Sequence, residues 1–215
     1  KPYTGYPSYG ISHMPRLYSG AYGLGSRDLQ PEALIAAVEN MLPEGGQRTF
    51  FYLGIEFVRE PTDPKDEIRV QQTIDAYPQV RDLALKGSEN PDLLPKGAIT
   101  VRLHSVGGWG AVTTGKNLAM TLYELLGFDI RANPKYGSEK KGQPTTYFLS
   151  AAPEPIRLNC EYTYVDVVMS PDPNVFTHSN PLFGLKEDGV FIIQSELDEA
   201  DEVWKRIPMH AQRFI

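Results

Sequence analysis

The chain has 215 residues, of which 41% are hydrophobic and 22% are charged, so it has enough apolar content to bury a core. Its formal net charge of −6 argues against a dedicated nucleic-acid-binding protein, which needs clustered Lys and Arg to neutralise phosphates. The single cysteine, Cys160, excludes an internal disulfide framework, an all-cysteine zinc site and a four-cysteine iron–sulfur cluster held by this chain alone.

The first quarter of the chain differs in composition from the rest. Residues 1–25 hold five tyrosines among five glycines and three prolines, which prevents a long regular element. We expect an extended strap across another domain or subunit; the alternative is that the tyrosines stack on a ligand. A helix is predicted from Pro31 to a stop at Pro43, with these apolar residues at helical spacing: Leu34, Ile35, Val38, Met41 and Leu42.

Residues 49–55 then suit a buried strand. One helix followed by one strand is half of an α/β unit, and the chain opens with Lys1 rather than methionine. We therefore expect a piece of a longer polypeptide. A connector follows over residues 59–97, with five prolines and one short helix around Val70–Leu85, and the predicted domain boundary lies at Lys96-Gly97.

The second half, residues 98–215, has the strand–helix alternation of a layered α/β domain. A strand over Ile99–Leu103 precedes a glycine loop and a helix over Lys116–Leu126. The later predicted elements are strands at Thr145–Ser150, Tyr162–Met169 and Val190–Ile193 and a helix at Glu196–Ile207. No apolar run approaches the roughly 18 residues of a membrane span, so we expect a cytoplasmic protein with no membrane and no nucleic-acid partner.

The glycine loop between this strand and helix is the most informative segment. A strand that ends in glycines before a helix presents backbone N–H groups to an anion. The dinucleotide fingerprint fails because Thr113 stands where its third glycine belongs. The nucleotide P-loop pattern fits from Gly110 through Lys116, but Asn117 replaces the hydroxyl residue that should ligate magnesium. A third interpretation is that the glycines only permit close packing of helix and strand.

Four blocks together resemble a known family. Residues 106–112 (V-G-G-W-G-A-V) with Gly115-Lys116-Asn117 resemble the opening of the gamma domain of 2-oxoacid:ferredoxin oxidoreductases, which include pyruvate:ferredoxin oxidoreductase. Residues 136–142 are similar to the second loop of that domain, and residues 185–193 to its L-K-x-G-G strand. Upstream, residues 22–28 with Pro31 resemble the end of the preceding transketolase-C-like domain. Trp109 and Gln143-Pro144 depart from the family pattern.

The resemblance implies a three-layer α/β sandwich over residues 98–215. Residues 1–97 would then be the strap, the end of the transketolase-C-like domain and a linker. It further implies a non-catalytic part of a thiamine diphosphate-dependent enzyme that oxidatively decarboxylates a 2-oxoacid, such as pyruvate, and reduces ferredoxin. Thiamine diphosphate, magnesium and the [4Fe–4S] clusters would lie on companion domains or subunits of an oligomer.

By the same resemblance, this chain would contact coenzyme A. The implied cofactor-binding residues are Gly107, Gly108, Gly110, Ala111, Val112 and Lys116 of the first loop, with Ser138 and Lys140 of the second. Oxalate-oxidising relatives form no acyl-coenzyme A, and in such a case the loops would be structural. The bulky Trp109 keeps that case open. Two further alternatives are a stand-alone P-loop-like nucleotide-binding protein and a purely structural subunit with no ligand.

The other chemical candidates carry no motif. His13, His104, His178 and His210 lack metal-ligand spacing, and we expect each to be satisfied or exposed. Asp166 at a strand end imitates a magnesium-holding aspartate, although a capping or solvated role is the simpler interpretation. Cys160 has no neighbour that would activate a thiol.

Overall fold

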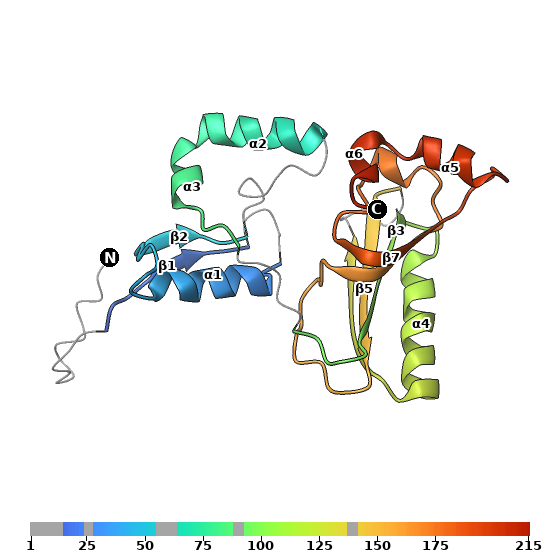
Figure 1. Cartoon of the computed structure of the whole chain (residues 1–215), viewed down its shortest axis with the longest axis horizontal. Helices are drawn as coiled ribbons and strands as arrows, with labels where there is room; N and C mark the ends of the chain where they lie inside the picture. The colour runs from blue at the N-terminus through green and yellow to red at the C-terminus, as the bar shows by residue number, and fades with distance from the viewer. Residues whose placement is uncertain (1–14, 24–27, 55–63, 88–92, 137–141) are drawn as a thin grey trace.

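The computed structural model describes residues 15–23, 28–54, 64–87, 93–136 and 142–215. These residues form two separate β-sheets, each with its own helices. The two units lie side by side in Figure 1. Every helix within the described ranges falls short of the length or the apolar character that crossing a bilayer requires.

The N-terminal sheet has two parallel strands, β1 (Ser19–Ala21) and β2 (Phe50–Tyr52), joined through helix α1 (Pro31–Met41). The expectation of half an α/β unit is therefore wrong, because β1 supplies the missing strand from within the predicted strap. The single helix predicted around Val70–Leu85 is also wrong. Two helices stand there, α2 (Pro64–Ala76) and α3 (Pro78–Leu83), because a proline ring cannot continue the helix that precedes it.

Helix α1 is confirmed, but its large apolar side chains are not the ones that pack. Ala33 and Ala37 contact Phe51 and Leu53 in the small core of this unit. The exposed apolar side chains of the helix are Leu34, Val38 and Met41. Small residues on the inner face let the helix lie close to the two strands.

The C-terminal sheet has five strands in the order β4-β5-β3-β6-β7. Their bounds are β3 (Ile99–Val106), β4 (Asp129–Tyr136), β5 (Pro144–Ala152), β6 (Val165–Ser170) and β7 (Leu185–Ile193). The central strand β3 pairs antiparallel with β5 and parallel with β6, so the sheet is mixed. Helix α4 (Ala111–Leu126) packs against β3, β4 and β5 on one face.

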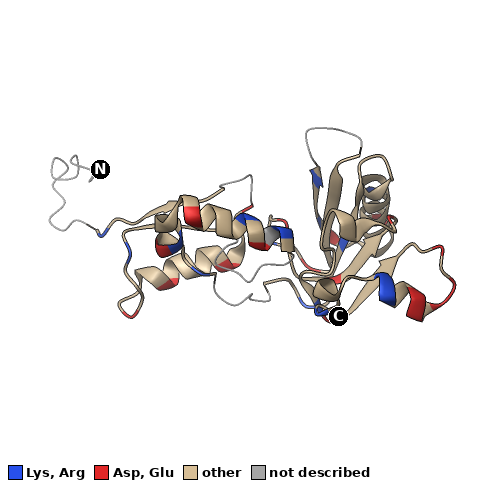
Figure 2. Ribbon diagram, turned by 90° about the horizontal axis from the view of Figure 1, so that it is seen from above, with Lys and Arg blue, Asp and Glu red and all other residues tan. Residues whose placement is uncertain are grey.

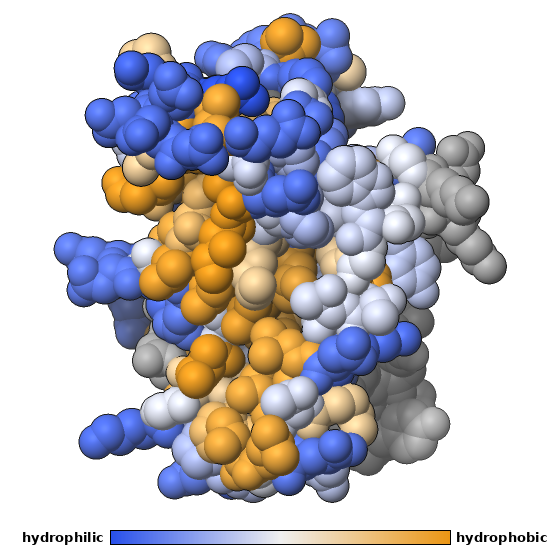
Figure 3. Space-filling view, turned by 90° about the vertical axis from the view of Figure 1, so that its right-hand side faces the viewer, coloured by the Kyte–Doolittle hydropathy of each residue, from blue (hydrophilic) through white to orange (hydrophobic). Residues whose placement is uncertain are grey.

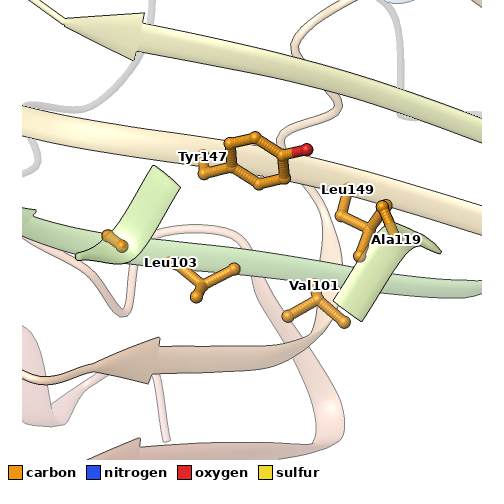
Figure 4. Packing of buried hydrophobic residues seen from close by; sticks show 6 residues of the cluster. Val101, Leu103, Ala119, Tyr147 and Leu149 are labelled. Atoms are coloured by element: carbon orange, nitrogen blue, oxygen red, sulfur yellow. The ribbon is translucent and has the colours of Figure 1, made fainter. Parts of the chain in front are cut away.

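The core under α4 is built by alternate residues of two strands. Val101 and Leu103 of β3 and Tyr147 and Leu149 of β5 are buried, and Figure 4 shows them with Ala119 of α4. Successive strand residues face opposite sides of a sheet, so Arg102 and His104 lie on the other face.

The segments on either side of β6 contact Arg102 on that other face. The Arg102 guanidinium donates hydrogen bonds to the carbonyl oxygens of Thr163 (2.8 Å) and Pro181 (2.9 Å) and also to that of Phe183. Two short helices follow β7, α5 (Ala200–Arg206) and α6 (Met209–Gln212), and Ala211 of α6 packs on Leu182.

The predicted α/β class is confirmed, whereas several predicted bounds are wrong. The layer opposite α4 is mostly irregular chain. Strand β4 was not predicted, α4 starts five residues before Lys116, and β7 starts five residues before Val190. The predicted helix at Glu196–Ile207 is shorter at both ends, and Pro208 separates it from α6.

Candidate functional site

A cleft of about 380 Å³ opens where β3 ends and α4 begins. Five residues predicted from sequence line it together: Gly107, Gly108, Gly110, Ala111 and Val112. The other lining residues are Ser105, Val106, Thr113, Tyr136 and Thr145. The glycine loop therefore forms one wall of a real concavity.

Positive backbone angles shape this wall. Gly108 has φ of +99° and Gly110 has φ of +86°, a region that side-chain-bearing residues rarely adopt. The Trp109 amide closes a turn onto the Val106 carbonyl at 3.2 Å. Among the described residues beyond the chain neighbours, no heavy atom lies within 4 Å of the place a Cβ would take on either glycine, so these residues leave space open in front of the helix.

The second loop is tied to the first by backbone hydrogen bonds. The Gly107 amide donates to the Gln143 carbonyl at 2.8 Å, and the Gly142 amide donates to the Gly107 carbonyl at 3.2 Å. Ser138 and Lys140 lie outside the described residues. The described end of the second loop nevertheless meets the first loop beside the cleft.

The chemistry of the cleft is that of a helix N-terminus. Gly110 is the N-cap and offers no side-chain cap, and the Thr114 amide makes an intrahelical bond to the Gly110 carbonyl at 2.8 Å. The amides that precede Thr114 in the helix have no carbonyl partner within the helix, and the helix dipole favours negative charge there. None of the described residues that line the cleft is Lys or Arg. An anion here would be held by amides and by hydroxyl groups.

Lys116 is not in the cleft. It is exposed on the second turn of α4 and is absent from the lining residues. The P-loop interpretation is wrong, since residues 111–116 are already helical and cannot wrap a phosphate. A Cβ on Gly115 would lie 2.3 Å from Cδ1 of Tyr147, so this glycine serves close packing of helix and strand.

Tyr136 and Thr145 line the cleft but were missed by sequence reasoning. They are cross-strand partners in β4 and β5, and they reach the cleft because β4 pairs with β5 and β5 in turn pairs with β3. Tyr136 is the first residue of the block 136–142 that resembles the second loop of the family, and this is the signal in the sequence that could have placed it at the site. Trp109 is exposed on the loop and does not line the cleft.

Asp166 is engaged in structural contacts. Its carboxylate accepts hydrogen bonds from the amide and the hydroxyl of Thr100, each at 2.7 Å, and pairs with Lys186 at 2.9 Å. Burial acts to raise the pKa of Asp166, but the bonds from Lys186 and Thr100 outweigh it and the pKa is lowered. No group of three His, Cys, Asp or Glu that could hold a metal occurs among the described residues.

Cys160 and His104 are both perturbed by burial. The pKa of the Cys160 thiol is raised to about 11, chiefly by desolvation and then by nearby carboxylates, which agrees with the prediction of an unactivated thiol. His104 was expected to be hydrogen-bonded or exposed, but its Nε2 is buried with no hydrogen-bond partner among the described residues. Its pKa lies well below 6.5, first because of burial and then because of Arg102 and His178.

Comparisons with known proteins agree with the predicted resemblance. The family described as pyruvate ferredoxin/flavodoxin oxidoreductase matches residues 100–214. The pyruvate/ketoisovalerate oxidoreductases common subunit gamma of Pyrococcus abyssi is 37% identical over 112 residues, which are 51% of this chain and 60% of that protein. The chain thus spans about 60% of the length of this curated relative.

Two further relatives extend the comparison. The pyruvate:ferredoxin oxidoreductase of Moorella thermoacetica is 26% identical over 196 residues, or 91% of this chain and 15% of that protein. The crystal structure of the pyruvate oxidoreductase subunit PORC of Thermotoga maritima has 27% sequence identity and a TM-score of 0.44. That alignment covers 52% of this chain and 57% of the subunit.

Proposed function

The chain belongs to the pyruvate ferredoxin/flavodoxin oxidoreductase family, and from this premise we propose that it is the gamma part of a 2-oxoacid:ferredoxin oxidoreductase. Residues 98–215 form the gamma domain, and residues 1–97 are a strap, the end of a transketolase-C-like domain and a linker. The whole enzyme is a cytoplasmic oligomer that oxidatively decarboxylates pyruvate or a related 2-oxoacid and reduces ferredoxin. Companion domains or subunits carry the thiamine diphosphate, its magnesium and the [4Fe–4S] clusters, since one cysteine cannot hold a cluster.

Within that enzyme, the cleft at the start of α4 receives a phosphate group of coenzyme A. The observation that carries this proposal is a helix N-terminus without a side-chain cap, in front of which two positive-φ glycines leave space that the described residues do not fill. Coenzyme A supplies the thiol that accepts the acyl group. The part of this chain is to bind and orient the cofactor through backbone amides and the hydroxyls of Ser105 and Thr145.

The basic side chains that would attract the phosphate lie outside the residues that line the cleft. Lys116 lies one turn beyond the amides and is exposed, so it contributes a positive potential rather than a direct contact. Ser138 and Lys140 are the proposed contributors of the second loop, whose described neighbours Gly142 and Gln143 bond to Gly107.

The decisive experiment measures coenzyme A binding to the assembled enzyme by calorimetry. Gly110→Ala places a methyl group in the cleft and disturbs the amides, so we expect affinity to fall about tenfold or more. Gly127→Ala is the matched control, because Gly127 caps the other end of α4 with positive φ and open space around it. Lys116→Ala should weaken binding only about two- to threefold, and less at high salt.

A purely structural role of the loop is the second candidate. It is favoured by the packing of Gly115 on Tyr147 and by the absence of Lys and Arg among the described lining residues. If Gly110→Ala and Lys116→Ala both bind coenzyme A like the parent enzyme, the cleft is structural. A chain that never assembles with thiamine- and cluster-carrying subunits would overturn the gamma-part proposal itself.

A further inference from the structure

Among the described elements, no helix packs over one half of the sheet face that carries α4. The contacts of α4 fall on β3, β4 and β5, whereas β6 and β7 form the other side of the sheet. Val190 and Ile192 of β7 are register partners of Val167 and Met169 of β6, which pack at the margin of the core under α4. Side chains of register partners point the same way, so Val190 and Ile192 extend this apolar face to the sheet edge.

These two side chains are open to solvent. Val190 is 51% exposed and Ile192 is 48% exposed, while Phe191 between them packs into the core of the opposite face. The strands of a parallel pair are ordinarily covered on both faces. The β6–β7 pair therefore has a covered face and an uncovered one.

The exposed side of α4 adds to this surface. Met120, Leu125 and Leu126 are exposed large apolar residues of the helix. Figure 3 views this side of the molecule and shows a broad apolar band below a hydrophilic region. We refer to Met120, Leu125, Leu126, Val190 and Ile192 as the α4-side surface. Contiguous apolar patches of this kind mark sites of interaction.

An acidic segment borders the α4-side surface. Residues 195–202, which connect β7 to the first turn of α5, contain five acidic residues and no basic one. All five are exposed, and none forms an ion pair with another described residue: Glu196, Asp198, Glu199, Asp201 and Glu202. Figure 2 shows this acidic run on the loop that leads into α5.

We propose that the α4-side surface binds a companion polypeptide of the oxidoreductase that presents an apolar strip bordered by Lys and Arg. The apolar residues would exclude water at the centre, and the acidic segment would set orientation and association rate from the rim. This inference depends on the proposed function, since it takes its partner from that complex.

The charges argue against other occupants. A symmetric pair of copies would bring two acidic segments to one interface, and each chain already carries a net charge of −6. An anionic membrane would repel the same segment. A basic protein surface satisfies both the apolar and the acidic parts.

The first test is zero-length carbodiimide cross-linking of the assembled enzyme, followed by mass spectrometry. The reagent joins a carboxylate to a contacting lysine amine as an amide and takes up the released water. We expect residues 195–202 to be linked to lysines of one companion subunit. Cross-links from other acidic residues of this chain, but none from this segment, would overturn the proposed surface.

The second test compares variants in assembly with the purified companion subunits. Ile192→Asp should raise the dissociation constant at least tenfold, whereas Ile68→Asp on an exposed site of α2 should leave it unchanged. Glu199→Lys changes an exposed side chain that belongs to none of the apolar clusters, so it tests the rim with little effect on the core. It should slow association severalfold and reduce the salt dependence of the association rate.

The outcomes separate the two proposals. If the parent chain assembles and Ile192→Asp and Glu199→Lys assemble equally well, the surface is wrong and the gamma-part proposal stands. If the parent chain dimerises and Ile192→Asp abolishes this, the occupant is a second copy and the inference is overturned. Failure of the parent chain to assemble at all would instead contradict the proposed function.

Discussion

Gly115 illustrates at the scale of one residue how a missing Cβ sets the distance between α4 and the sheet. A Cβ there would lie 2.3 Å from Cδ1 of the buried Tyr147 ring. On an open helix, Gly→Ala stabilises by about 1 kcal/mol. Because the ring and β5 must shift here, we expect Gly115→Ala to lower the free energy of unfolding by about 1–3 kcal/mol in urea titrations.

Tyr147→Leu removes the ring that the new methyl group would meet. The double variant should therefore be less destabilised than the sum of the two single variants. Strict additivity would show that the cost of Gly115→Ala does not come from this contact.

Because His104 is buried, we expect the free energy of unfolding to fall in acid. Burial, with added repulsion from Arg102 and His178, holds its folded-state pKa well below the ordinary 6.5. Below about pH 6.5 the unfolded chain therefore binds more protons than the folded chain, so stability is complete above that pH and falls beneath it. Denaturant unfolding between about pH 7 and 5 should show this slope, and His104→Gln should flatten it. An unchanged slope in the variant would assign the acid effect to other groups.

Sequence predicts the residues of the cleft wall where these are local in the chain, and their binding of coenzyme A stays a prediction. Gly107, Gly108 and Gly110 line the cleft because a strand, a glycine turn and a helix follow one another along the chain. Tyr136 and Thr145 reach the cleft through strand pairing, which local sequence does not encode. Lys116 was placed by a motif that assumes a loop where the chain is already helical.

At the scale of elements, the bounds of α4 show what propensity misses. Thr113, Thr114 and Gly115 are poor helix formers, so a start at Lys116 was the natural prediction. The helix begins at Ala111, because Ala111 and Gly115 are small enough to pack on the sheet. Tertiary packing thus overrides local propensity over the first turn.

Strand β4 is not predicted, for a related reason. Its charged residues and Pro134 suit an edge strand, and sequence alone does not distinguish such a strand from a loop.

Helix α1 gives a prediction about faces. Val38 is exposed, whereas Ala36 is buried, although hydrophobic spacing alone would favour Val38 as the core residue. We expect Val38→Lys to change the unfolding free energy of the isolated chain by less than about 0.5 kcal/mol. Ala36→Leu should cost about 1–3 kcal/mol by overpacking, as measured by chemical denaturation. The reverse order of the two effects would mean that α1 packs through its large residues.

At the scale of the whole molecule, the two sheets have separate cores. One apolar cluster consists of Ala33, Ala37, Phe51 and Leu53, and the other two draw only on residues beyond 100. Between the two parts, the Glu161 amide donates to the Asp28 carboxylate at 2.6 Å, and the Gln30 side chain donates to the Glu161 carbonyl at 2.9 Å. The Lys65 ammonium also donates to the Thr177 carbonyl at 3.3 Å, and no apolar cluster of the described residues spans both parts. The core of residues 98–215 is therefore complete without residues 1–97.

This separation predicts that residues 98–215 fold alone. Loss of the hydrogen bonds to Asp28, Gln30 and Lys65 should lower stability by about 1–3 kcal/mol, which leaves the five-stranded sheet intact. The fragment should give dispersed amide NMR signals and one cooperative thermal transition, whereas a matched fragment of residues 107–215 should not, because it lacks the central strand β3. If residues 98–215 are unfolded while the full chain is folded, the boundary at Lys96-Gly97 cuts through one cooperative unit, and the proposed division into two domains is wrong.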